Sequence, residues 1–157
     1  MASLVVRLGE EMLRFPGMLP REIVVWVEWL KAHAGEYDRF EYNTRVGTGL
    51  DPGPSYPPEI RQQAILNSQK RIDAVGYKIT QITLFEVKDR AGLSAVGQLL
   101  GYRVLWLRAA PQGPTPLLRL LCATCSPDMW DVATATGIWM ELVKADFSIL
   151  RPTGKPF

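Results

Sequence analysis

The stretch RIDAVGYKITQITLFEVK, residues 71–88, decides the fold of this chain. Its two halves, 71–75 and 79–88, are rich in β-branched and aromatic residues, and the Gly76-Tyr77 step between them predicts a turn, so the stretch predicts an antiparallel hairpin. The end of the second half, ITLFEVK, is apolar on both faces of a strand. Because strands covered on both faces have this pattern, we expect the second hairpin strand to lie in the middle of a sheet.

Helix and strand patterns alternate on both sides of this hairpin. Periodicity and helix start and stop signals predict helices over residues 3–14, 21–34, 58–70, 93–108 and 127–136. Strand patterns cover residues 37–46, 70–76, 79–88, 117–124 and 138–143. Residues 47–58, which hold four Pro and three Gly, predict a long loop after the first strand. The order of these elements predicts an α/β fold in which helices flank a central mixed β-sheet.

The composition is that of a single soluble globular domain. The 157 residues are 47% hydrophobic and 22% charged, with a formal net charge of +2, and this small surplus gives no argument by itself for a nucleic-acid or membrane partner. The longest apolar run, residues 23–27, is far shorter than the roughly 20 residues that span a bilayer. We therefore expect a cytoplasmic protein with no membrane partner. The predicted parts of the domain are a helical N-terminal extension at 1–20, a core at 21–143 and a tail at 144–157.

Charged residues at the end of the predicted central strand indicate where chemistry is carried out. Glu86 and Lys88 are two residues apart, so they point to the same face, roughly 6.6 Å apart along the strand. The hairpin brings Asp73 either directly opposite them or one pair away on the diagonal. Burying such groups is costly unless they are paired or bind a metal. Two carboxylates with hard oxygen ligands beside an ammonium group suit a divalent ion, and Lys88 can orient or help to deprotonate a water.

These residues resemble the signature of the PD-(D/E)xK nucleases. Asp73 matches the Asp of that motif, and the segment 86–88 (Glu-Val-Lys) matches its E-x-K, thirteen residues on. Ile72 stands where the motif has Pro. The resemblance covers roughly residues 21–143 and implies a restriction-endonuclease-like core with the order αβββαβ. It also implies an enzyme, a DNA nuclease that depends on Mg²⁺ or Mn²⁺ and hydrolyses phosphodiester bonds with a metal-activated water.

A second motif is similar to that of the RecB-like exonuclease branch, in which Gln-x-x-x-Tyr follows the E-x-K strand. Here Gln98 and Tyr102 have this spacing on a predicted helix, and residues four apart share a helical face. The iron-sulfur cluster of some members of this branch is not implied, because the chain has only two Cys, at 122 and 125.

The resemblance also implies a role for each residue of the site. Asp73 and Glu86 would hold the metal, and Glu22, at the start of the helix before the first strand, would complete its shell. Glu28 is the second choice for that acidic residue. Lys88 would position the nucleophile. Gln98 and Tyr102 would orient the scissile phosphate.

Several basic residues near the motif elements are candidates for binding DNA. Such residues can follow the phosphates of a nucleic-acid backbone. They are Arg61, Lys70, Arg71, Arg90 and Arg103. The loop 47–58 and the helix after it are expected to flank the site and select the form of DNA, because loops beside a rigid sheet commonly carry specificity. The sequence leaves open which DNA structure is preferred and whether cutting is internal or from an end.

Other interpretations of the same residues stay open. The charged hairpin residues could form an ordinary ion network at a sheet edge. Gln98 and Tyr102 could be a helix-to-sheet contact that Gly97 and Gly101 permit by close approach. His33, the single histidine, is interpreted as a surface or capping residue.

The alternative function is a structural component of a virus particle or DNA-packaging assembly that keeps a nuclease fold as a scaffold, with a location in the virion. The apolar leading segment 4–13 and the tail 146–157 would then dock on neighbouring copies, as in a homo-oligomer.

Overall fold

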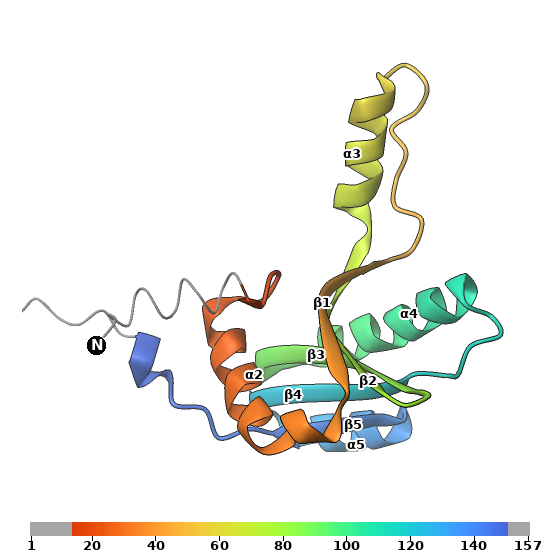
Figure 1. Cartoon of the computed structure of the whole chain (residues 1–157). Coiled ribbons are helices and arrows are strands. Elements are labelled where there is room, and N and C mark those ends of the chain that lie inside the picture. Colours follow the sequence, from red (N-terminus) through yellow and green to blue (C-terminus); the bar gives the residue numbers. More distant parts are fainter. Residues whose placement is uncertain (1–13, 151–157) are drawn as a thin grey trace, which may run out of the picture.

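The computed structural model describes residues 14–150, which form a five-stranded sheet with helices on both faces (Figure 1). The strands are β1 (Arg39–Val46), β2 (Lys70–Lys78), β3 (Gln81–Ala91), β4 (Leu117–Cys125) and β5 (Ile138–Leu142). The helices are α2 (Pro20–His33), α3 (Pro58–Ser68), α4 (Leu93–Ala109) and α5 (Asp128–Ala135), with short 3-10 helices η1 (Ala34–Glu36) and η2 (Phe147–Leu150). The predicted helix at 3–14, the apolar segment at its start and the last seven residues of the tail lie outside the described residues, apart from Arg14.

The sheet is mixed, in the order β1-β2-β3-β4-β5. The pairs β1–β2 and β2–β3 are antiparallel, whereas β3–β4 and β4–β5 are parallel. The predicted α/β fold with a central mixed sheet is therefore confirmed, and β3 is its middle strand as expected. With α3 as an insertion between β1 and β2, the elements from α2 to β4 follow the order αβββαβ. Among the described residues, no helix is long and apolar enough to cross a membrane.

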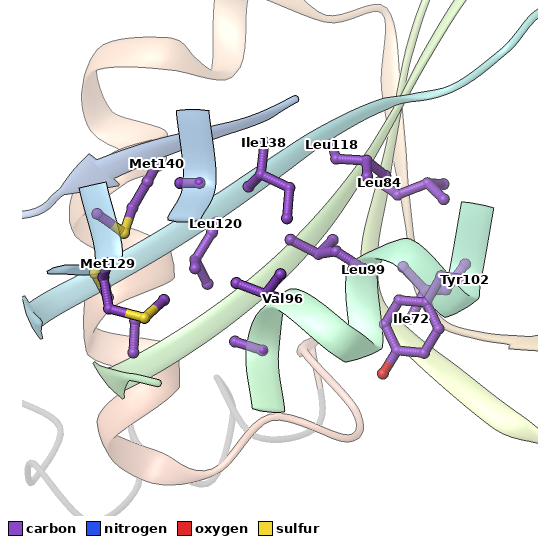
Figure 2. Packing of buried hydrophobic residues seen from close by; sticks show 14 of the residues in the cluster. Ile72, Leu84, Val96, Leu99, Tyr102, Leu118, Leu120, Met129, Ile138 and Met140 are labelled. Atoms are coloured by element: carbon purple, nitrogen blue, oxygen red, sulfur yellow. The ribbon is translucent and has the colours of Figure 1, made fainter. Parts of the chain in front are cut away.

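Apolar side chains cover both faces of β3, which explains its continuous apolar sequence. On one face, Val96 and Leu99 of α4 pack on Leu84 and on residues of β4, as Figure 2 shows. On the other face, the two Trp rings of α2 pack on Phe85 at centroid distances of 5.2 and 5.1 Å. Because both faces of β3 are covered, a charged residue on this strand can reach water only near the end of the strand.

The hairpin turn is not where the sequence predicted it. The prediction placed it at Gly76-Tyr77, but β2 continues to Lys78, Gly76 pairs with Thr83, and the turn lies at 79–80. Gly76 is needed for another reason: a Cβ there would lie 2.7 Å from the ring of Tyr37 and 3.0 Å from that of Phe85. The glycine marks a close approach of aromatic rings to the strand, and the sequence alone does not distinguish this from a turn.

Residues 47–69, which we name the arm, project from the sheet where β1 ends and β2 begins (Figure 1). The last pair of these strands is Val46 with Lys70, and Gln69 Nε2 donates to the carbonyl of Gly47 at 2.7 Å, which closes the base of the arm. No residue of α3 is buried. The arm is therefore joined to the sheet at its base, where Lys70, the first residue of β2, is three residues before Asp73.

The packing at Gly76 makes a prediction for stability. Gly76→Ala should lower the free energy of unfolding by roughly 1–3 kcal/mol, because the added methyl group meets the Tyr37 ring in a packed layer. Gly97→Ala is the matched control: nothing lies within 4 Å of its Cβ position, so alanine in α4 should stabilise the protein by about 1 kcal/mol. Urea denaturation measures both changes. Equal effects of the two substitutions would contradict this account of Gly76.

Candidate functional site

The centre of the candidate site is Glu86 on β3. Glu86 is only 1% exposed, and its Oε1 lies 2.7 Å from Nζ of Lys88. Its other oxygen, Oε2, is buried and accepts no hydrogen bond from the part of the chain that the structure describes. A buried carboxylate oxygen without a donor is costly, so this atom has capacity for a ligand that carries positive charge.

Asp73 joins Glu86 from β2. The ladder between β2 and β3 reaches Ala74 with Phe85, so the next position along it sets Asp73 against Glu86. At this position the backbone N–H of Val87 donates to Oδ2 of the Asp73 side chain at 2.8 Å, and not to a backbone carbonyl of β2. Of the two registers that the sequence left open, the direct one follows when the ladder is continued by one residue.

Glu22 reaches the same centre from the first turn of α2. Its Oε2 accepts the backbone N–H of Leu19 at 2.8 Å, which fixes the side chain at the start of the helix. Its Oε1 lies 3.7 Å from Nζ of Lys88. Glu28, the second choice from the sequence, instead pairs with Lys31 on the exposed side of α2. The structure therefore brings together Glu22, and not Glu28, with the hairpin residues.

Helix α4 contributes Gln98 and Tyr102. Gln98 Nε2 donates to the Tyr102 hydroxyl at 3.3 Å, and Tyr102 is 5% exposed beside Ile72 and Leu99 (Figure 2). Burial and the nearby Glu86 and Asp73 charges raise the pKa of Tyr102, so its hydroxyl keeps its proton. The glycines do not act as the sequence suggested: Gly97 and Gly101 are exposed, with nothing near their Cβ positions, so they do not serve a close approach of α4 to the sheet.

The charges of the centre are strongly coupled. Burial raises the pKa of Asp73 to about 8, and the Glu86 charge adds to this shift. Burial likewise raises the pKa of Glu86, although Lys88 opposes the rise. Burial is the largest single influence on the pKa of Lys88 and acts to lower it, but the hydrogen bond to Glu86 and the charges of Glu86, Asp73 and Glu22 together raise that pKa above its usual value. Lys88 therefore keeps its proton in this arrangement, and acts as a cation and hydrogen-bond donor rather than as a base.

The carboxylates of the centre can be compared with what a divalent ion such as Mg²⁺ or Mn²⁺ requires of its ligands. No group of three or more His, Cys, Asp and Glu side chains within residues 14–150 is arranged to hold a metal. The unbonded Glu86 Oε2 and the adjoining Asp73 carboxylate are hard oxygen donors. Mg²⁺ is commonly held by one or two carboxylates together with water and substrate phosphates. The donors therefore fit this type of binding, and do not fit a metal site made of protein ligands alone.

The basic residues predicted to bind DNA do not form one cluster around this centre. Lys70 and Arg71 begin β2 at the base of the arm, and Arg90 follows Lys88 on β3. Arg103 is half-buried on α4. Arg61 lies on α3, where it is ion-paired with Asp51 of the arm.

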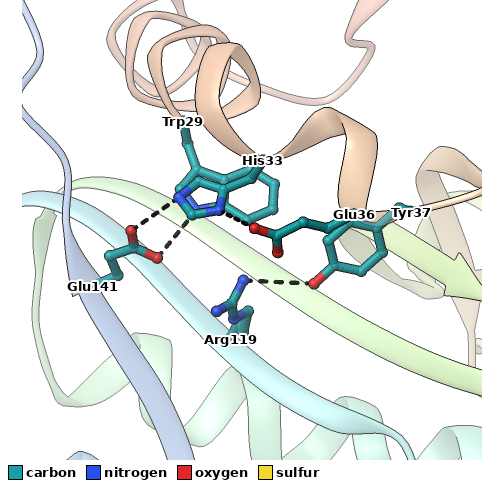
Figure 3. Close-up of polar contacts among 6 residues, drawn as sticks. All are labelled: Trp29, His33, Glu36, Tyr37, Arg119 and Glu141. Atoms are coloured by element: carbon teal, nitrogen blue, oxygen red, sulfur yellow. Dashed lines mark hydrogen bonds and ion pairs between the residues drawn. The ribbon is translucent and has the colours of Figure 1, made fainter.

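A second polar cluster, which the sequence did not indicate, surrounds His33 at the far end of α2 (Figure 3). Its ring stacks on Trp29 at a centroid distance of 4.6 Å and lies between Glu36, at 2.9 Å from Nδ1, and Glu141, at 3.4 Å from Nε2. Glu141 also accepts from Trp29 Nε1 at 3.0 Å. The eleven residues from Glu22 to His33 span about 16 Å of helix, so this cluster is separate from the centre at Glu86. His33 at the end of α2 thus contacts Glu141 of β5, so it takes part in the packing of α2 against the sheet in addition to lying at the surface.

Comparisons with known proteins give a distant likeness. No protein-family model and no curated protein sequence matches the chain. Among solved structures, one that is similar is EndoMS in complex with double-stranded DNA, at 13% identity and a TM-score of 0.48, over 82% of this chain and 47% of that one. Another is AF1548, a protein of unknown function, also at 13% identity and a TM-score of 0.48, over 76% and 56%. The chain thus spans about half the length of each.

The raised pKa of Asp73 makes a prediction for stability against pH. Between about pH 4 and pH 8 the folded protein holds a proton at Asp73 that the unfolded chain has released, so the free energy of unfolding should fall as pH rises through this window. Asp73→Asn cannot ionise but keeps an oxygen for the Val87 N–H. In this variant, the decrease in the free energy of unfolding across the window should therefore be smaller than in the wild type by at least about 1 kcal/mol.

Urea denaturation of the metal-free protein between pH 4.5 and 8.5 measures the effect. Asp51→Asn is the control: the Asp51 carboxylate is exposed, and Arg61 holds its pKa down at about 2, so its removal should leave the fall in place. Parallel profiles for the wild type and Asp73→Asn would contradict the assignment of the buried proton to Asp73.

Proposed function

We propose that this protein is a metal-dependent nuclease that hydrolyses phosphodiester bonds in DNA, with its active centre at Asp73, Glu86 and Lys88. The observation that carries the proposal is the buried Glu86 carboxylate, which has one oxygen on Lys88 and the other unbonded. An ion network that served stability alone would satisfy both oxygens, because an unsatisfied buried carboxylate costs several kcal/mol. A site that accepts a cation and a phosphate explains why the chain keeps this arrangement.

Mg²⁺ or Mn²⁺ fits the donors as the cofactor: Glu86 and Asp73 would be its ligands, and Glu22 would complete the shell. When bound, such an ion supplies a Lewis acid that stabilises negative charge on the phosphoryl group. With a cation held at Glu86, Lys88 would share that carboxylate with it. The Lys88 ammonium group would donate to a phosphate oxygen or orient the attacking water.

The residues of α4 complete the proposed centre. The Gln98 amide and the Tyr102 hydroxyl are hydrogen-bond donors one turn apart on α4, and Tyr102 lies near the Glu86 and Asp73 carboxylates. They can hold the scissile phosphate in line for attack, which is the kind of positioning that lowers a hydrolytic barrier. Lys70, Arg71, Arg90 and Arg103 can contribute to binding the DNA backbone, whereas Arg61 is already matched by Asp51.

A cleavage assay tests the proposal. Linear, nicked and branched DNA are incubated with the wild type in Mg²⁺ or Mn²⁺, and cleavage is expected with at least one of these substrates. Lys88→Met keeps the length of the side chain but removes its charge, and it should lower the rate by roughly a hundredfold or more. Lys144→Met, a change of an exposed lysine after β5, is the matched control and should cut at the wild-type rate.

Thermal unfolding establishes that each variant is folded before its rate is compared. Cleavage by Lys88→Met at the rate of the control would remove Lys88 from the mechanism. An inactive wild type on all three substrates with both metals would contradict the nuclease assignment itself.

A further inference from the structure

Two arginines at the base of the arm face each other across neighbouring strands. Arg45 of β1 and Arg71 of β2 are direct partners in the antiparallel register. Both are exposed, and neither side chain has an ion pair or hydrogen bond with any residue in the described range 14–150. Like charges directly opposite each other destabilise a strand pair. The pair is thus an unfavourable feature of the free protein that a bound anion would neutralise.

The surroundings of the pair are basic. Lys70 adjoins Arg71, and residues 42–50 and 60–72 contain no Asp or Glu. By contrast, Arg39 on the same strand is matched by Glu41 and lies over the Tyr77 ring at 3.7 Å. The structure therefore leaves charge unmatched on β1 only at the end that meets the arm, so an anion is attracted to this end.

The pair lies two residues along the strands from Asp73 of the proposed centre. The register sets Asn43 against Asp73, between the pairs Tyr42 with Ala74 and Thr44 with Ile72. Asn43 has a φ of 54°, and no ladder pair forms at its level. Arg71 is two residues before Asp73, which is roughly 6.6 Å along a strand and comparable to the separation of neighbouring phosphates in a nucleic-acid strand.

We propose that Arg45 and Arg71 together bind a backbone phosphate of DNA next to the one at Lys88, so that the cleaved strand runs along the base of the arm. Two guanidinium groups facing each other can hold a single phosphate through several charge-assisted hydrogen bonds. This role is one of substrate positioning, and it rests on the proposed function for its choice of ligand. It also gives the arm a location beside the bound strand.

DNA binding without hydrolysis tests the proposal. The affinity of the wild type for a fluorescent DNA strand is measured by anisotropy in EDTA at several salt concentrations. Arg45→Ala and Arg71→Ala should each weaken binding about fivefold to tenfold. Each should also reduce the slope of log affinity against log salt by about 0.7–0.9, as expected for one phosphate contact. Arg39→Ala, which removes a paired arginine from the same strand, should leave both quantities unchanged.

Arg45→Glu separates binding from folding. It creates a cross-strand ion pair with Arg71, so its melting temperature should be equal to or above that of the wild type. The same variant should bind DNA more than tenfold more weakly. A purely structural role would give the rise in melting temperature without the loss of binding. Arg45→Lys, which keeps the charge, should restore most of the affinity.

The outcomes distinguish this inference from the nuclease assignment. Wild-type affinity and salt slope in both alanine variants would overturn the inference, even if the wild type cuts DNA. Loss of binding in these variants supports it, even if the wild type proves unable to cut DNA in Mg²⁺ or Mn²⁺. A wild type that binds no DNA at low salt would overturn it as well.

Discussion

The burial of the Glu86 carboxylate on the middle strand is the constraint on which the rest of the structure depends. A charge enclosed by two layers of helices has to be compensated, and Lys88, two residues along the same strand, supplies the compensating charge to one oxygen. The second carboxylate, Asp73, raises the cost further: its burial, together with the Glu86 charge, shifts its pKa to about 8. The centre therefore holds more acidic groups than its single ammonium group can balance once they ionise. This excess of acidic groups is the feature that favours a cation.

The fold delivers each group to this centre by a different structural route. The hairpin register sets Asp73 against Glu86, α4 packs across the sheet to present Tyr102, and the N-terminal turn of α2 fixes Glu22. Because these elements pack through apolar faces on both sides of β3, the polar groups are held by a rigid framework. The arm is not part of this framework, since no residue of α3 is buried.

The middle strand and its partner Asp73 could be predicted from the sequence because their signals are local. ITLFEVK is apolar on both faces, and the spacing of Asp73 and Glu86 allows only two registers. The turn could not be located from Gly76, since a glycine that admits the Tyr37 ring and a glycine in a turn look the same in a sequence. The projection of the arm was also beyond prediction, because loop composition does not give a direction.

The other features that the sequence did not predict depend on pairings between residues far apart in the chain. The pairing of Arg45 with Arg71 joins residues that the arm separates in the chain, so neither arginine alone indicates it. The link between His33 and Glu141 likewise joins α2 to β5. Glu22 and Glu28 both fit the sequence pattern, and the choice between them depends on which turn of α2 meets β3. Local periodicity carries no such information.

Direct binding of Mn²⁺, measured by isothermal titration calorimetry with and without a short DNA strand, tests the central claim most directly. The account predicts that Mn²⁺ binds at the Asp73 and Glu86 carboxylates, more tightly when DNA phosphates are present, and that Glu86→Gln abolishes this binding while the protein stays folded. Absence of Mn²⁺ binding to the wild type under both conditions, or equal binding by Glu86→Gln, would contradict it.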